Sequence, residues 1–100
     1  MLTMDLAGMV ALIVGGSRGI GAGIVDAFAR AGATTLFTHT GQPHYAEQVQ
    51  KMLDQLRADG CQVEAAVADA CEPETTKAVV EQATRDFGRL DVLVANVGQN

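Results

Sequence analysis

The sequence predicts an α/β fold in which a parallel four-stranded sheet carries helices on both faces. Short apolar runs alternate with amphipathic segments along the 100 residues, and each amphipathic segment ends at a glycine. A glycine-rich turn follows the first apolar run. Strands separated by helices of this length are joined by right-handed crossovers and lie parallel. We therefore expect the strand order 3-2-1-4, which is half or slightly more of a doubly wound fold.

The first strand, helix and second strand are predicted from residues 10–40. Val10–Val14 is a continuous apolar run, as expected for a central strand that is covered on both faces. Ile20–Ala31 has apolar residues at helical spacing, and Gly32 follows in the usual C-terminal position. Thr34–Thr40 is rich in β-branched residues, which favour a strand.

The second helix has the clearest amphipathic pattern in the chain. It is expected over Tyr45–Asp59, after the break at Gly41-Gln42-Pro43, and Gly60 ends it. Gln62–Ala68 then predicts a third strand. The apolar face of this helix is expected to consist of Val49, Met52, Leu53 and Leu56.

The third helix begins at a proline. Pro73 suits the first position of a helix because its missing N–H would have no partner there. The helix is expected to run to about Phe87, and Gly88 ends it. Leu90–Ala95 predicts the fourth strand. No linker or repeat interrupts the pattern, so we expect a single domain over residues 1–100.

Composition excludes several classes of function. The net charge is −5 and no Lys/Arg cluster exists, so a nucleic-acid surface is not expected. The first apolar run is too short to span a membrane and no targeting segment is visible, so we expect a cytoplasmic protein without a membrane partner. Cys61 and Cys71 are expected to be free thiols, and their spacing matches no metal site.

The glycine-rich turn carries the main functional signal. Gly15, Gly19 and Gly21 follow the first strand and precede the first helix. A tight bend needs backbone angles that side chains obstruct, and the helix that follows directs unpaired N–H groups and a positive dipole end outward. A phosphate or pyrophosphate fits that position. The spacing of Gly16 and Gly21 also suits a triphosphate-binding loop, but Ala22 and Gly23 stand where that loop needs lysine and a hydroxyl residue.

The segment Ala11–Gly21 closely resembles the opening of the short-chain dehydrogenase/reductase family. Asp69 stands where that family keeps an aspartate after its third strand, and Phe87–Val94 is similar to its approach to the fourth. The segment 95–98 occupies the place of the family's Asn-Asn-Ala-Gly signature. The resemblance covers essentially the whole chain. It implies a Rossmann fold, a dinucleotide cofactor and hydride transfer between nicotinamide and an alcohol or carbonyl carbon.

The resemblance also implies which residues hold the cofactor. The residues around the phosphates are Gly15, Ser17, Arg18, Gly19, Ile20 and Gly21. His39 and Thr40 lie beside the adenosine ribose, and Asp69 and Ala70 lie near the adenine. The residues near the inner ribose are Asn96, Val97 and Gly98.

The residues after the second strand favour NADP over NAD. Proteins selective for NAD place a carboxylate there, about 20 residues past the glycines, whereas this chain has His39 and Thr40. Arg18 can pair with a 2′-phosphate through two hydrogen bonds. Other interpretations stay open: Arg18 as a solvated loop charge, His39 as a cap of the strand end, and Asp69 as a helix N-cap or turn residue.

Three positions depart from the family pattern. Val14 replaces a threonine whose hydroxyl bonds the backbone near the signature in the family, Ala95 replaces the first asparagine of the signature, and Val97 is larger than the family's alanine. These positions meet in family structures. We therefore expect apolar packing to replace polar bracing around the turn.

The catalytic groups of the family are not found in this sequence. The family uses a tyrosine, a lysine four residues later and a serine, but the only tyrosine, Tyr45, is followed by Val49, and the only serine is Ser17. We expect a truncated cofactor-binding part without activity of its own. A non-catalytic dinucleotide-binding or interaction module is the alternative. The open edge along Leu90–Ala95 predicts self-association or pairing with a missing C-terminal half.

Overall fold

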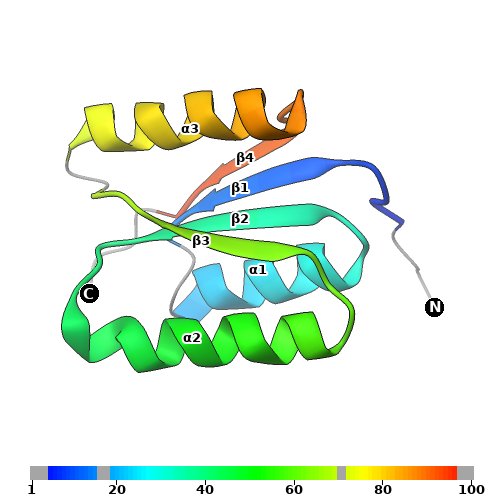
Figure 1. Cartoon of the computed structure of the whole chain (residues 1–100), viewed down its shortest axis with the longest axis horizontal. Helices are drawn as coiled ribbons and strands as arrows, with labels where there is room; N and C mark the ends of the chain where they lie inside the picture. The colour runs from blue at the N-terminus through cyan, green and yellow to red at the C-terminus, as the bar shows by residue number, and fades with distance from the viewer. Residues whose placement is uncertain (1–4, 16–18, 70–71, 97–100) are drawn as a thin grey trace.

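A computed structural model describes residues 5–15, 19–69 and 72–96. Its four parallel strands form one sheet in the order β3-β2-β1-β4, which confirms the predicted order 3-2-1-4. Helices α1 and α2 cover one face of the sheet and α3 lies on the other (Figure 1). The strands are β1 Val10–Val14, β2 Thr34–His39, β3 Val63–Val67 and β4 Val92–Ala95; the helices are α1 Gly19–Arg30, α2 Pro43–Ala58 and α3 Pro73–Phe87.

Strand β1 is the centre of the fold. All five of its residues are buried, as its continuous apolar run predicts. It pairs with β2 on one side and with β4 on the other, so the chain reverses its direction of winding at this strand. Crevices that bind ligands in open parallel sheets lie at such a reversal, beyond the carboxyl ends of the strands.

The sheet separates two apolar clusters. Ala11 and Ile13 of β1 face α1 and α2, where they pack with Val25, Phe37 and other residues. Val10, Leu12 and Val14 face α3 and pack with Ala83. This strict alternation follows from the two-residue repeat of a strand. The single helix on the second face leaves the Leu93 side chain of β4 54% exposed.

The helix and strand boundaries differ slightly from those predicted. α2 begins at Pro43 rather than Tyr45, because proline is well suited to the first helical turn. β4 begins at Val92 rather than Leu90, because the side chain of Asp91 turns back to accept a hydrogen bond from Val10 N–H. The bounds of β1 and α3, the start of β2 and the end of β4 are as predicted, and the remaining ends differ by one residue. Within the described residues, no helix is long and apolar enough to cross a membrane.

Candidate functional site

The carboxyl ends of β1 and β4 meet directly at the glycine turn. Gly15 follows the last residue of β1, and Asn96 follows the last residue of β4. The Asn96 N–H donates to the carbonyl oxygen of Val14 at 2.9 Å. Its side-chain amide Nδ2 donates to the carbonyl oxygen of Gly15 at 3.1 Å. Asn96 therefore holds the turn through both its backbone and its side chain.

Gly15 occupies a position that other residues fit poorly. Its φ angle is +80°, in the left-handed region that disfavours side chains. A Cβ atom added there would also overlap the backbone oxygen of Asn96. Glycine is therefore required at this point for two independent reasons, the backbone angle and the close approach of the neighbouring strand.

A buried threonine holds the other side of the same residue. The Gly15 N–H donates to the hydroxyl oxygen of Thr38 in β2 at 2.9 Å. Polar bracing is therefore present at Gly15, whereas the expected apolar packing concerned the side chains at 14, 95 and 97, of which residue 97 lies outside the described residues. Val14 is indeed buried, but hydrogen bonds from β2 and from the end of β4 hold the turn.

Helix α1 begins at Gly19, immediately beyond the part of the turn that lies outside the described residues. Gly21 is buried, whereas the Ile20 side chain is 77% exposed at the start of the helix. The first N–H groups of a helix have no partner within the helix, so this end attracts anions. Predicted site residues outside the described part of the chain are Ser17, Arg18, Ala70, Val97 and Gly98.

His39 ends β2 near the same edge. Its ring atom Nδ1 accepts a hydrogen bond from Gly41 N–H at 3.2 Å, which requires a ring without a proton on that nitrogen. Partial burial lowers the pKa of His39 from its ordinary value of 6.5. A neutral ring then carries its proton on Nε2 and can donate one hydrogen bond. The next residue, Thr40, is exposed.

Asp69 lies in the turn between β3 and α3. Its N–H donates to the hydroxyl oxygen of Thr75 at 2.9 Å, and its carbonyl oxygen accepts the N–H of Glu72 at 2.8 Å. The N-cap of α3 is Glu72, so Asp69 is a turn residue rather than the cap of this helix. The described candidate residues thus lie at or just beyond the carboxyl ends of the four strands.

Comparison with known proteins identifies the family. Residues 9–100 match the family model for short chain dehydrogenase. The chain belongs to the short-chain dehydrogenase family. A hydroxynaphthalene reductase of Aspergillus fumigatus is 38% identical to it over 95 residues, which are 95% of this chain and 34% of that protein.

Solved structures show the same relationship. A blue fluorescent protein from a metagenomic library, in complex with NADPH, is 38% identical, with a TM-score of 0.87 over 96% of this chain and 38% of that one. A metagenomic short-chain oxidoreductase in complex with NADP is 31% identical, with a TM-score of 0.83 over 94% of this chain and 41% of that one. The chain therefore spans between about a third and two fifths of the length of these relatives.

Two residues of the candidate site were not predicted from the sequence. Thr38 and Thr75 each hydrogen-bond a residue of the carboxyl edge, Gly15 and Asp69 respectively. A polar residue within an otherwise apolar strand was the available signal for Thr38. The signal was ambiguous, because Thr35 stands in the same strand and its hydroxyl group bonds the carbonyl oxygen of Ala33 instead.

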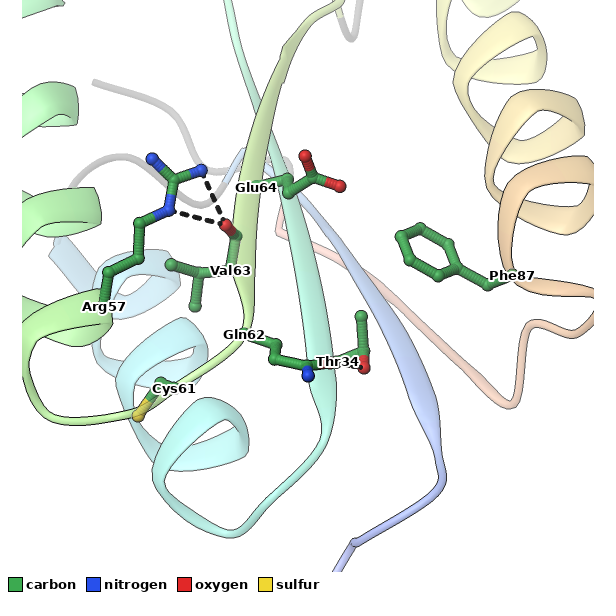
Figure 2. Close-up of a pocket in the computed structure, with 7 residues that line it drawn as sticks. All are labelled: Thr34, Arg57, Cys61, Gln62, Val63, Glu64 and Phe87. Carbon is green, nitrogen blue, oxygen red and sulfur yellow. Dashed lines mark hydrogen bonds between the residues drawn. The ribbon is translucent and has the colours of Figure 1, made fainter.

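A cavity of about 350 Å³ lies at the opposite edge, near the amino ends of β2 and β3 (Figure 2). Figure 2 shows Arg57 on one side of β3, donating twice to the Val63 carbonyl oxygen, and Glu64 and Phe87 on the other side. This edge is remote from the helix N-terminus that attracts an anion, so we do not assign the cofactor to it. The cavity is lined by Thr34, Arg57, Cys61, Gln62, Val63, Glu64 and Phe87.

No group of residues in the described part of the chain could hold a metal ion.

Proposed function

We propose that this chain is the NADP-binding part of a short-chain oxidoreductase. The observation that carries the proposal is the held turn at Gly15, which leads from the central strand to the start of α1 at the point where the sheet reverses its winding. Such a turn leaves room for the diphosphate of a dinucleotide beside the unpaired N–H groups of the helix.

The remaining contacts follow the four strand ends. The residues around the turn, Gly15 to Gly21, would hold the phosphates, and His39 and Thr40 would lie beside the adenosine ribose. Asp69 and Ala70 would lie near the adenine, and residues 96–98 near the inner ribose. His39 supports this assignment because its Nδ1 accepts the Gly41 N–H, which leaves an Nε2–H to donate to a ribose or phosphate oxygen.

Two observations support NADP rather than NAD. The end of β2 has no carboxylate at residues 39 and 40 that would repel a 2′-phosphate. Two similar structures, at 38% and 31% identity, contain NADPH and NADP. Arg18 is the residue that we propose pairs with the 2′-phosphate, because a guanidinium binds phosphate oxygens through two hydrogen bonds.

Titration calorimetry with NADPH and NADH tests this proposal. We expect the chain to bind NADPH more tightly, and Arg18→Ala to weaken NADPH binding by about 10-fold with little change for NADH, as a charge-assisted hydrogen bond predicts. Arg85→Ala, which removes an exposed arginine from α3, is the matched control and should bind both cofactors as the parent does. Equal loss of NADPH and NADH affinity in Arg18→Ala would instead assign the arginine to the shared part of the cofactor.

We propose that hydride transfer belongs to a longer protein and not to residues 1–100 alone. Tyr45 lies in the first turn of α2 and the only serine, Ser17, belongs to the glycine-rich segment, so neither supports the family's catalytic arrangement. The purified chain should bind NADPH without oxidising it in the presence of ketones. NADPH oxidation that persists after repurification would contradict this proposal.

The alternative, a binding or interaction module that never takes part in turnover, makes the same prediction for the chain alone. A Tyr-x-x-x-Lys sequence encoded downstream of residue 100 would favour the oxidoreductase over the binding or interaction module.

We also propose that the open side of β4 is paired in the functional protein, either with a second copy of the chain or with a C-terminal segment. β4 is at the end of the strand order, and its Leu93 side chain is largely exposed. Light scattering of the purified chain should show association. A monomer with a cooperative thermal transition would contradict this pairing proposal.

The free thiol of Cys61 supports a cytoplasmic location for the whole protein.

A further inference from the structure

Strand β2 contains two threonines that are almost completely buried, Thr35 at 0% and Thr38 at 1% exposure. Their hydroxyl groups have different partners. Thr35 Oγ1 donates to the carbonyl oxygen of Ala33 at 3.1 Å, two residues away in the same segment. Thr38 Oγ1 accepts the N–H of Gly15 at 2.9 Å, across to the end of β1 and 23 residues away. Only the second contact links two elements of the fold.

The position of Thr38 explains why a hydroxyl group is useful there. The backbone pairing between β1 and β2 ends at Ile13 and Phe37, so Gly15 lies beyond the last paired residues. A partly buried N–H group that loses its acceptor is destabilising, and a valine in place of Thr38 would fill the same space without offering an acceptor. The hydroxyl group therefore extends the hydrogen bonding of the sheet by one contact, into the turn.

The Thr38 contact acts on a residue that has little freedom. Gly15 has a positive φ angle, its carbonyl oxygen accepts the Asn96 side chain, and its Cα lies against the Asn96 backbone. The N–H bond to Thr38 fixes the peptide group before Gly15, and the Asn96 bond fixes the one after it. Together they set the direction in which the chain leaves β1 towards α1.

We infer that Thr38 is a positioning residue for the cofactor, which acts by holding the Gly15 peptide and so the turn beside the phosphates. The inference rests on the proposed dinucleotide site. Thr38 is buried beneath the turn and acts through Gly15, so its effect is separate from that of any residue that touches the cofactor.

The test compares Thr38→Val with Thr35→Val. The two changes remove the same group from equally buried positions three residues apart in one strand. Amide hydrogen exchange at Gly15 is measured by NMR, NADPH affinity by calorimetry and overall stability by urea unfolding. In Thr38→Val we expect Gly15 exchange to be faster and the NADPH dissociation constant to be higher, each by about 10-fold. In Thr35→Val both should stay within about 2-fold of the parent, whatever happens to the urea midpoint.

A conservative variant provides the rescue. Thr38→Ser keeps the acceptor oxygen and should retain both the protected Gly15 amide and the parent's affinity. If Thr38→Val does not fold, Thr38→Cys takes its place, because a thiol has nearly the size of the serine hydroxyl group but is a weak acceptor. Gly15 exchange should then be faster in Thr38→Cys than in Thr38→Ser.

The outcomes separate this inference from the proposed function. Unchanged Gly15 exchange in Thr38→Val, or an equal change in Thr35→Val, overturns the inference whether or not NADPH binds. Faster exchange at Gly15 with unaltered NADPH affinity also overturns it, because the turn would then be held without consequence for the cofactor. If the parent chain does not bind NADPH but Gly15 is still released specifically in Thr38→Val, the proposed function fails and Thr38 keeps its role in the turn.

Discussion

The two ends of β1 are both held by side chains from neighbouring segments, but with different chemistry. At the amino end, the Asp91 carboxylate accepts the Val10 N–H at 2.8 Å, and Asp91 N–H donates to the Val10 carbonyl oxygen at 2.9 Å. Arg89 donates to the same carboxylate at 2.7 and 2.9 Å. At the carboxyl end, Thr38 and Asn96 hold Gly15 through neutral groups.

The difference agrees with the phosphate site proposed at the carboxyl end. A carboxylate is a strong hydrogen-bond acceptor, but beside the glycine turn it would repel the phosphates of a dinucleotide. Asp91 is at the far end of a five-residue strand, about 16 Å from the turn at the usual rise of a strand. The charged contact is thus at the end away from the proposed anion site, and the neutral contacts are at the end proposed to bind an anion.

The largest expected effect is at Gly15. Gly15→Ala places a Cβ atom against the Asn96 backbone at a positive φ angle, so we expect a loss of about 2–3 kcal/mol in the free energy of unfolding together with lost NADPH binding. Gly23→Ala is the matched control. Gly23 is inside α1 with open space around its Cα, and alanine there should stabilise the chain by about 0.5–1 kcal/mol. Urea unfolding measures the stability of both variants, and an equal change in the two would contradict the special requirement for glycine at position 15.

The second effect is at Asn96. Asn96→Ala removes the side-chain bond to Gly15 but keeps the backbone bond to Val14, so we expect a loss of about 1 kcal/mol and a measurable rise in the NADPH dissociation constant. Gln50→Ala is the control, because it removes an amide hydrogen bond of similar length to Asp54 on the exposed face of α2. It should leave stability and binding nearly unchanged. An Asn96→Ala chain indistinguishable from Gln50→Ala would show that the backbone bond alone holds the turn.

The smallest effect is at Asp91 and depends on pH. Hydrogen bonds from Arg89 and, second, from the Val10 N–H hold the pKa of Asp91 below its ordinary value of 3.8. Because the pKa is lower in the folded state, the carboxylate contributes stability above about pH 4, and this contribution is lost as the pH falls through the folded pKa.

Asp91→Asn tests this dependence by urea unfolding at several pH values. The variant can still accept the Val10 N–H but loses the ion pair, so its urea midpoint should be below the parent's at neutral pH and approach it as the pH falls below about 4. Glu81→Gln removes an exposed carboxylate from α3 and should show a smaller gap at neutral pH. NADPH affinity at neutral pH should be the same in both variants and in the parent. Weaker binding in Asp91→Asn would mean that the two ends of β1 are coupled.

Much of the fold could be predicted because its signals are local. The unbroken apolar run of β1 predicted burial on both faces, and Pro73 and Gly88 marked the two ends of α3. The glycine turn could be predicted for the same reason, since a left-handed φ at Gly15 is a property that glycine alone supplies cheaply. The start of β4 shifted by two residues where the Asp91 side chain bonds the N–H of Val10 in the neighbouring strand.

The bracing of the turn could not be predicted in the same way. The residues next to Gly15 in the sequence suggested apolar packing, and Thr38 and Thr35 were equally plausible polar residues of one strand. Which of the two reaches the turn depends on the register between β1 and β2, and a shift of one residue would direct the side chains of β2 to the opposite faces of the sheet.

The sequence by itself therefore determined the order of the strands and helices, the family and the place of the glycine turn, because hydrophobic periodicity and glycine conformation act over a few residues. Only the tertiary structure decided which side chains hold that turn. Thr38 and Asn96 are 23 and 81 residues from Gly15, and only the assembled sheet brings their polar atoms within hydrogen-bonding distance of its peptide groups.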